Sequence, residues 1–406
     1  MTLIECFTDS HIDNIAACLG LQPDRLIFFG NGKEMEEPLK RYRQLLQRRN
    51  MPTRVSACDV AEVDFARLCQ GLTKLVCDAG DCIIDLTGGA PDVIMAVGAV
   101  YAQLPGDVRR RVQIKKYDHC AGVVRDCITG VESNQCEQAS LSVEEMIELH
   151  GGGFRAGAYQ PPKSCDSRDI RRIWEMVCQD PKQWNHEMAL LSEAESRSVS
   201  KTQVFLPLFY LRSSISGFAK KEEEIREVLD KLRDSGIIRE ERRSDAWSYS
   251  YPDELMRYCT QKAGNVLEVK TLLESRAVLD RGEPFFRDCQ MSVTIDWDGK
   301  DEKGRGRTPD TCNEVDVVLM HGLTPVFVSC KNGNVDENEL YKLHTVAHWF
   351  GGPYAKKMLV ATDLNWAENR ALIYRAQDMG IRIVTDGADR SSSQWAEAFR
   401  SAVEQG

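Results

Sequence analysis

The chain has 406 residues, of which 42% are hydrophobic and 28% charged, and its formal net charge is -10. This is the composition of an ordinary globular protein of roughly two to three domains, and it excludes a fibrous or wholly disordered chain. The acidic balance argues against a basic surface for bulk nucleic-acid binding, but it does not exclude a local basic cleft.

Membrane and secretory classes are also disfavoured. The longest nearly uncharged apolar stretch, residues 93–104, is too short to span a bilayer. The first residues carry an early acid and no basic region, so we expect no signal peptide. The fifteen cysteines include no Cys-x-x-Cys and match no zinc-ligand spacing. We therefore expect a cytoplasmic protein with reduced cysteines and no membrane partner.

The first 120 residues alternate between strand-like and helix-like patterns. We expect strands at 3–7, 25–29, 54–58, 82–86 and 112–116, with helices at 11–19, 35–49, 65–78 and 91–104 between them. Repeated strand–helix–strand units predict a mostly parallel sheet with helices on both faces.

The pattern from 121 to 255 is looser. Lys220 to Arg233 reads as an amphipathic helix, and Ser235 to Ile238 and the charged segment Arg239 to Arg243 follow it. This order resembles the end of a winged-helix unit. A solvated helical linker remains an equal alternative.

The last 150 residues form a second α/β pattern. We expect helices at 264–275, 338–350 and 366–379, and strands at 289–297, 314–320, 326–331, 357–362 and 382–385. A charged loop at 299–308 carries Lys300, Lys303, Arg305 and Arg307, which form either a solvated surface or a basic rim for a nucleic-acid backbone.

A predicted hairpin in this part concentrates polar residues on one side. Because strand side chains alternate between faces, Glu314 and Asp316 share a face of the first strand, and Ser329 and Lys331 share a face of the second. We expect Lys331 to point at Asp316 across the hairpin. Two acids and a lysine on a half-buried sheet are costly unless something binds them.

Phosphodiester hydrolysis would explain this arrangement. Paired carboxylates hold Mg²⁺ or Mn²⁺, which prefer oxygen ligands, and the ion activates water. A nearby lysine stabilises the charge of the transition state. Glu268, in the first turn of the preceding predicted helix, could face the same site. The alternative is a hairpin with a charged, solvated face.

The arrangement resembles the PD-(D/E)xK nuclease core, which has an acid on a helix, an Asp in a hairpin and a strand ending in x-x-Lys. Asp316 and Lys331 match, whereas the acid of the second strand falls at Ser329. Glu314 is the preferred substitute and Glu268 the next. The resemblance implies Glu314, Asp316, Lys331 and Glu268 as catalytic residues, with Asp316, Glu314 and Glu268 as metal ligands.

Two N-terminal loops follow predicted strands at the edge where open α/β sheets bind ligands. The first is Thr8-Asp9-Ser10, with Asn14 one turn into the next helix, and the second runs from Asp85 to Pro91 through Gly88-Gly89. Paired glycines let the backbone approach a ligand, and helix N-termini attract phosphate. On their own, these loops are more simply explained as two tight turns.

The two loops together resemble the CARF domain, a sensor of cyclic oligoadenylates. Ser10, Asn14 and the segment Asp85-Leu86-Thr87-Gly88-Gly89 match, while Ala90-Pro91 stands where Thr-Lys often follows. The ligand-binding residues that this resemblance implies are Thr8, Asp9, Ser10, Asn14, Gly30, Asn31, Thr87, Gly88, Gly89 and Ala90.

A CARF-like sensor followed by a PD-(D/E)xK-like core is similar to the CARF-nuclease ancillary effectors of type III CRISPR systems. The resemblance implies an α/β protein with a Rossmann-like CARF domain at 1–140, a winged-helix-like or helical region at 141–255 and a restriction-endonuclease-like domain at 256–406.

The same resemblance implies a homodimer. A cyclic oligoadenylate, most simply cyclic tetra-adenylate, would activate Mg²⁺- or Mn²⁺-dependent cleavage of DNA or RNA in antiviral defence. The alternative is a ligand-responsive transcription regulator without catalysis, and the absence of an acid at Ser329 is its best support.

Overall fold

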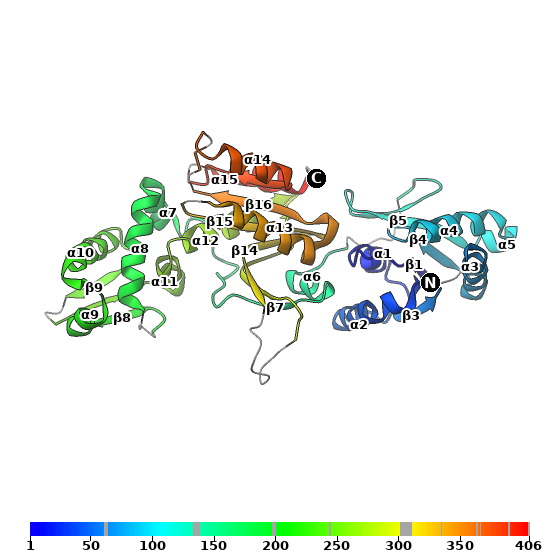
Figure 1. Ribbon diagram of the computed structural model, residues 1–406, viewed down its shortest axis with the longest axis horizontal. Coiled ribbons are helices and arrows are strands. Elements are labelled where there is room, and N and C mark those ends of the chain that lie inside the picture. Colours follow the sequence, from blue (N-terminus) through cyan, green and yellow to red (C-terminus); the bar gives the residue numbers. More distant parts are fainter. Residues whose placement is uncertain are drawn as a thin grey trace.

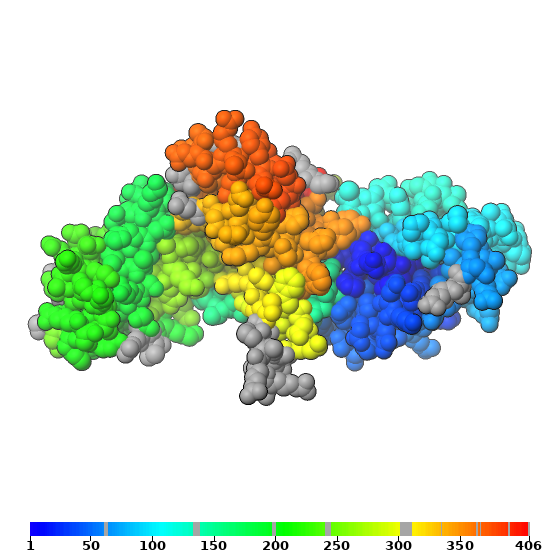
Figure 2. Space-filling model, viewed as in Figure 1, coloured from blue at the N-terminus to red at the C-terminus, as the bar shows by residue number. Residues whose placement is uncertain are grey.

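The computed structural model describes the chain except residues 61–63, 133–138, 197–199, 243–244, 301–310, 334, 363, 366, 389 and 405–406, and the side chains of 240–242. Lys303, Arg305 and Arg307 of the expected basic rim lie outside the described residues. Three units lie in a row, with the C-terminal unit between the N-terminal and middle units (Figures 1 and 2).

The N-terminal unit contains a six-stranded sheet in the order β3-β2-β1-β4-β5-β6, parallel except for the last pair. The strands are β1 (Thr2–Cys6), β2 (Arg25–Gly30), β3 (Arg54–Asp59), β4 (Cys82–Asp85), β5 (Val112–Asp118) and β6 (Val123–Asp126). The helices are α1 (Asp13–Leu21), α2 (Gly32–Arg48), α3 (Phe65–Ala79), α4 (Pro91–Gln103) and α5 (Gly106–Arg109).

Separate hydrophobic clusters cover the two faces of this sheet, one with α1 and α2 and the other with α3 and α4. The expected parallel, two-faced sheet is therefore confirmed. The strand order reverses direction between β1 and β4, which makes the carboxyl ends of these two strands the topological switch point where ligands bind in such folds.

The middle unit has the element order of a winged helix. It consists of α7 (Arg171–Gln179), α8 (Pro181–Glu195), β8 (Gln203–Pro207), α9 (Leu208–Ser214), α10 (Phe218–Asp234), β9 (Arg239–Arg242), β10 (Ala246–Ser250) and α11 (Glu254–Gln261). The strands pair antiparallel in the order β8-β10-β9. Helix α10 buries an apolar face that includes Ile225 and Leu232. A solvated linker would bury no such core, so this part of the chain is a folded unit, and its likeness to a winged helix stays a prediction.

The C-terminal unit contains a mixed six-stranded sheet in the order β17-β16-β15-β14-β13-β7. The strands are β7 (Gly153–Arg155), β13 (Asp288–Asp296), β14 (Cys312–His321), β15 (Thr324–Lys331), β16 (Lys356–Ala361) and β17 (Ile381–Val384). Helices α12 (Asn265–Arg276) and α15 (Ser392–Glu404) share one hydrophobic cluster with the sheet, and α13 (Glu337–Gly351) and α14 (Arg370–Asp378) share the other. Two short strands, β11 (Leu279–Asp280) and β12 (Glu283–Pro284), form a separate ribbon.

The region expected at 141–255 is not one structural unit. Its strand β7 pairs with β13 of the C-terminal sheet, and its helix α6 (Val143–Leu149) packs between α2 and α13. Two helix-to-helix contacts involve Arg49, which donates to Glu145, and Arg48, which pairs with Glu148. The chain between residues 140 and 255 therefore contributes to both neighbouring units. The two domain boundaries themselves stay a prediction.

The helices in the described ranges include none that combines the length and apolar character needed to cross a bilayer. No two cysteines of the described residues form a disulfide bond.

Candidate functional site

Asp316 interrupts the sheet at the point where β13, β14 and β15 lie side by side. Its Oδ2 accepts hydrogen bonds from the Cys330 backbone N–H at 2.6 Å and from the Ser329 hydroxyl at 3.3 Å. The regular pairing of β14 with β15 begins only at Val317 and Val328. The carboxylate therefore takes a backbone donor that a continuous ladder would use, and the strands open beside it.

Three carboxylates act on one another at this opening. Burial, together with the charges of Asp316 and Glu314, raises the pKa of Glu268 to about 7. Burial also raises the pKa of Asp316, although the Cys330 N–H and the charge of Lys331 oppose the shift. Glu314 itself is exposed. The structure thus brings the three expected acids within electrostatic reach of one another.

A local distortion of β13 at Ser292 positions Glu268. Ser292 has a φ of 49°, in the left-handed region, and its hydroxyl donates to Glu268 Oε2 at 3.3 Å. The Tyr258 hydroxyl lies 3.0 Å from the same serine oxygen. Helix α12 and this distorted strand together hold the acid against the sheet.

Lys331 does not pair with Asp316 as expected. Its Nζ lies 2.8 Å from Glu339 Oε2, on α13. Burial alone would lower the pKa of Lys331, but the contact with Glu339 and the charge of Asp316 outweigh it, so the pKa lies above its ordinary value. Sequence reasoning missed Glu339 because an acid in the first turn of a helix already has an explanation in the helix dipole.

Asp316, Lys331 and Glu339 line a polar pocket of about 320 Å³. Its charged and hydroxyl-bearing lining residues are Glu314, Asp316, Ser329, Lys331, Glu339 and Lys342. The pocket is too small for a folded macromolecule, but it suits an exposed phosphate group with its ion.

The donor chemistry fits a divalent cation. In the described part of the chain, no three acidic, histidine or cysteine side chains converge closely enough to hold a metal ion as they stand. However, the acids offer the hard oxygen ligands that Mg²⁺ and Mn²⁺ prefer. The pKa of Glu268 is raised by burial and by the charges of Asp316 and Glu314, which a cation would offset, and Glu314 is exposed.

The two expected ligand loops meet at the switch point of the N-terminal sheet. A Cβ on Gly88 would lie 2.3 Å from Thr8 Cγ2, and one on Gly89 would lie 2.8 Å from Cys6 Cβ. Gly89 also has a φ of 108°. Glycines are therefore required for the loop after β4 to lie against the loop after β1.

Two of the expected ligand residues shape these loops. Asn14 is fully buried, and its amide exchanges hydrogen bonds with the backbone of Thr8 at 2.9 and 2.7 Å. The Thr87 hydroxyl donates to Asp85 at 2.7 Å and accepts from the Tyr117 backbone at 2.6 Å. Their polar groups are thus engaged within the protein.

The other expected ligand residues differ in exposure. Asp9 and Ala90 are exposed, and Ser10, Gly88 and Gly89 are half-buried. At the end of β2, Gly30 is buried against Phe7, and Asn31 caps α2 by accepting from the Lys33 backbone at 3.1 Å. The solvent-accessible parts of these loops therefore include backbone and small side chains, whereas Asn14 and Gly30 are buried.

A buried pair of acids lies on the two strands that lead into these loops. Glu5 on β1 and Asp85 on β4 are partners in register, and neither is exposed to solvent. Burial raises the pKa of Glu5 well above its usual range and that of Asp85 to about 6, and each acid affects the other. Burial therefore disfavours the charged form of both acids.

A scan of family models identifies the C-terminal part of the chain. Residues 256–393 match the model described as Card1-like, endonuclease domain. This stretch of the chain is therefore similar to a Card1-like endonuclease domain. The matched range contains Glu268, Glu314, Asp316, Lys331 and Glu339, so the pocket lies within it.

Solved structures share the fold of nearly the whole chain. Protein VC1899 from Vibrio cholerae matches with a TM-score of 0.70 at 15% identity, over 100% of this chain and 97% of its own. Can2 from Sulfobacillus thermosulfidooxidans, solved with cyclic tetra-adenylate, matches with a TM-score of 0.65 at 16% identity, over 99% and 97%. A search of curated proteins finds no match. The expected α/β architecture is thus confirmed, and the match over residues 256–393 agrees with the expectation of a C-terminal nuclease domain.

The raised pKa of Glu268 predicts a pH-dependent stability. Because the folded acid binds its proton more tightly than the unfolded one, stability falls as pH rises from about 4.5 through 7, by about 1.4 kcal/mol for each unit of pKa difference. The melting temperature of Glu268→Gln should therefore be close to that of the wild type at pH 5 and higher than that of the wild type at pH 8. Melting curves in chelator test this, with exposed Glu337→Gln as the control. An equal offset at both pH values would contradict it.

Proposed function

We propose that this chain is a metal-dependent endonuclease of type III CRISPR antiviral defence, activated by a cyclic oligoadenylate. The observation that carries the proposal is the endonuclease-domain match over the residues that gather Glu268, Glu314, Asp316 and Lys331. The fold shared with Can2, which was solved with cyclic tetra-adenylate, supports the sensor half.

In this proposal, Asp316, Glu314 and Glu268 hold Mg²⁺ or Mn²⁺. The bound ion would activate water and neutralise charge on the phosphate. Asp316 is fixed by the Cys330 N–H, and Glu314 supplies the carboxylate that Ser329 lacks. The Lys331 ammonium stabilises the phosphate oxygens in the transition state.

The ligand would bind across the loops after β1 and β4. Gly88 and Gly89 let the backbone approach a phosphate, and the N-terminus of α4 faces the same loop, because Ala90 is its N-cap. We propose cyclic tetra-adenylate as the ligand. The raised pKa values of Glu5 and Asp85 favour their uncharged forms, which lowers the repulsion that two buried carboxylates would otherwise exert on an anion.

A homodimer is part of the proposal. Ile94 and Met95, in the first turn of α4 beside the crevice, are 41% and 58% exposed. Apolar side chains at the rim of a ligand crevice suit a second copy that closes over the ligand. Light scattering on the purified chain would give the oligomeric state.

The alternative of a transcription regulator receives one supporting observation, the winged-helix-like middle unit. A regulator, however, has no use for an endonuclease domain at 256–393. One experiment separates the two: the purified chain is incubated with Mn²⁺, a panel of cyclic oligoadenylates, and labelled single- and double-stranded DNA and RNA. Ligand-dependent cleavage supports the nuclease, and ligand-dependent binding without cleavage supports the regulator.

Substitution of the acids should abolish cleavage. Asp316→Asn keeps an oxygen for the Cys330 N–H but removes the charge, so we expect a loss on the order of 10²–10³ in rate with the fold intact. Glu314→Ala should be nearly as severe if Glu314 replaces the missing acid. Initial rates measure both, with exposed Glu337→Ala as the control. Near-normal cleavage by the Glu314 variant would move that role to Glu268.

Substitution in the sensor should weaken the response to ligand. Gly88→Ala places a methyl group against Thr8 Cγ2 and should raise the ligand concentration needed for half-maximal cleavage. Thr8→Ser removes that methyl from Thr8 and should restore part of the response in the double variant. Calorimetry with cyclic oligoadenylates measures the affinities. Unchanged affinity in Gly88→Ala would remove this loop from the binding site.

A further inference from the structure

Glu339 stands in the nuclease pocket without a role in the motif. It projects from the first turn of α13 and binds two lysines, Lys331 at 2.8 Å through Oε2 and Lys342 at 3.2 Å through Oε1. Burial would raise the pKa of Glu339, but the contact with Lys331 outweighs it, so the pKa lies below its usual value and the group is ionised.

We propose that Glu339 is a positioning residue for the nuclease reaction, holding the Lys331 ammonium in place for the phosphate. The proposal rests on the proposed function. The strand itself offers Ser329 rather than a carboxylate beside the lysine, so the fixing charge comes from a helix. A lysine on four methylene groups has many rotamers, and a transition-state donor must be held in one of them.

The backbone of Glu339 is itself fixed. Asp336 caps α13 and accepts from the Glu339 N–H at 3.2 Å. A pair whose side chains are about a quarter exposed, here 27% and 25%, contributes only about 0–1 kcal/mol to stability. If the pair were purely structural, its loss would lower the melting temperature only slightly. The cleavage rate is therefore the measurement that separates a structural role from a positioning role.

The test compares Glu339→Gln and Glu339→Asp with Glu337→Gln, a neighbouring exposed acid, in the full chain with Mn²⁺ and cyclic tetra-adenylate. We expect Glu339→Gln to lower kcat about 10–100-fold with little change in KM, and Glu339→Asp to be intermediate. In a Lys331→Met background, Glu339→Gln should cost nothing further.

Wild-type kcat in Glu339→Gln, or an equal loss in the Lys331→Met background, would overturn the positioning role while leaving the proposed function intact. A wild-type chain that cleaves no nucleic acid with any ligand would overturn the proposed function, and this inference with it.

A second observation concerns the junction between the sensor and the nuclease domain. The ring Nε2 of His119, just after β5, lies 2.7 Å from Asp13 Oδ1, which accepts the hydrogen bond, and the ring stacks on Tyr354 with centroids 3.7 Å apart. Asp13 lies three residues after Ser10 of the ligand loop, and its backbone N–H donates to the Ser10 hydroxyl at 3.4 Å. Tyr354 belongs to η1 (Gly352–Tyr354), the turn that ends α13.

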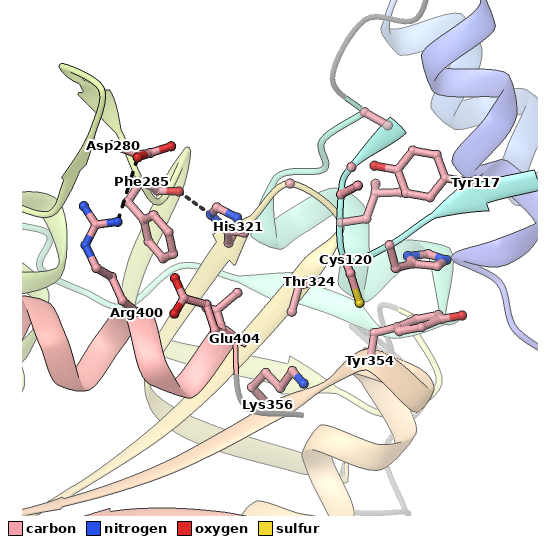
Figure 3. Close-up of a pocket in the computed structure, with 17 residues that line it drawn as sticks. Tyr117, Cys120, Asp280, Phe285, His321, Thr324, Tyr354, Lys356, Arg400 and Glu404 are labelled. Atoms are coloured by element: carbon pink, nitrogen blue, oxygen red, sulfur yellow. Dashed lines mark hydrogen bonds and ion pairs between the residues drawn. The ribbon is translucent and has the colours of Figure 1, made fainter. Parts of the chain in front are cut away.

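A pocket of about 460 Å³ opens at the same junction, with Tyr117 and Cys120 on one side and Tyr354 and Lys356 on the other (Figure 3). The stacked pair thus joins the two domains beside open space, where η1 has room to shift. We infer that the His119–Tyr354 stack transmits ligand occupancy from the Ser10 loop to α13, the helix that carries Glu339. This regulates the proposed site and rests on the proposed function.

Tyr354→Leu tests the route, with Tyr341→Leu, 45% exposed on α13, as the matched control. The measurement is the ratio of cleavage with and without cyclic tetra-adenylate. We expect Tyr354→Leu to keep the unstimulated rate and to lose stimulation about tenfold, and Tyr341→Leu to match the wild type. Stimulation equal to wild type in Tyr354→Leu would overturn the route. A wild-type chain that no ligand stimulates would overturn the proposed activation instead.

Discussion

The hydrogen bond from the Cys330 backbone to Asp316 is the constraint around which the C-terminal site is arranged. It interrupts the β14–β15 ladder, and the β13–β14 register likewise passes from Met291–Val317 to Val293–Val315 across Ser292. A continuous sheet would direct these residues alternately up and down. The interruption instead leaves an opening that an acid from α12 and a lysine paired to α13 can both reach.

The two candidate sites handle buried charge in different ways. In the N-terminal unit, Glu5 and Asp85 lie in register on adjacent strands, and burial raises the pKa of both carboxyl groups. In the C-terminal unit, Lys331 lines the same pocket as Glu314 and Asp316, but its ammonium is bound to Glu339. Negative charge at Glu268 is therefore only partly compensated by protein groups, which is the electrostatic setting in which a cation binds.

Local patterns predicted the fold well where each element carries its own signal. The apolar strand ending at Asp85, the glycine pair after it and the Pro91 at the start of α4 define a βα turn without reference to the rest of the chain. The partner of Lys331 could not be predicted, because α13 reaches β15 only through tertiary packing. Strand β7 was missed for the same reason: three residues have no periodicity, and their pairing with β13 spans about 140 positions of sequence.

That short strand has a consequence for how the protein can be divided. The C-terminal sheet ends at β7, which precedes the middle unit in the sequence. The fold of the C-terminal unit is therefore discontinuous in sequence, and the middle unit is an insertion within it. A fragment beginning at residue 256 would lose the backbone partners of Thr294 and Ile295 and the contact of Arg155 with Asp296, whose side chain is 4% exposed. It would carry an open sheet edge, a template for association between copies.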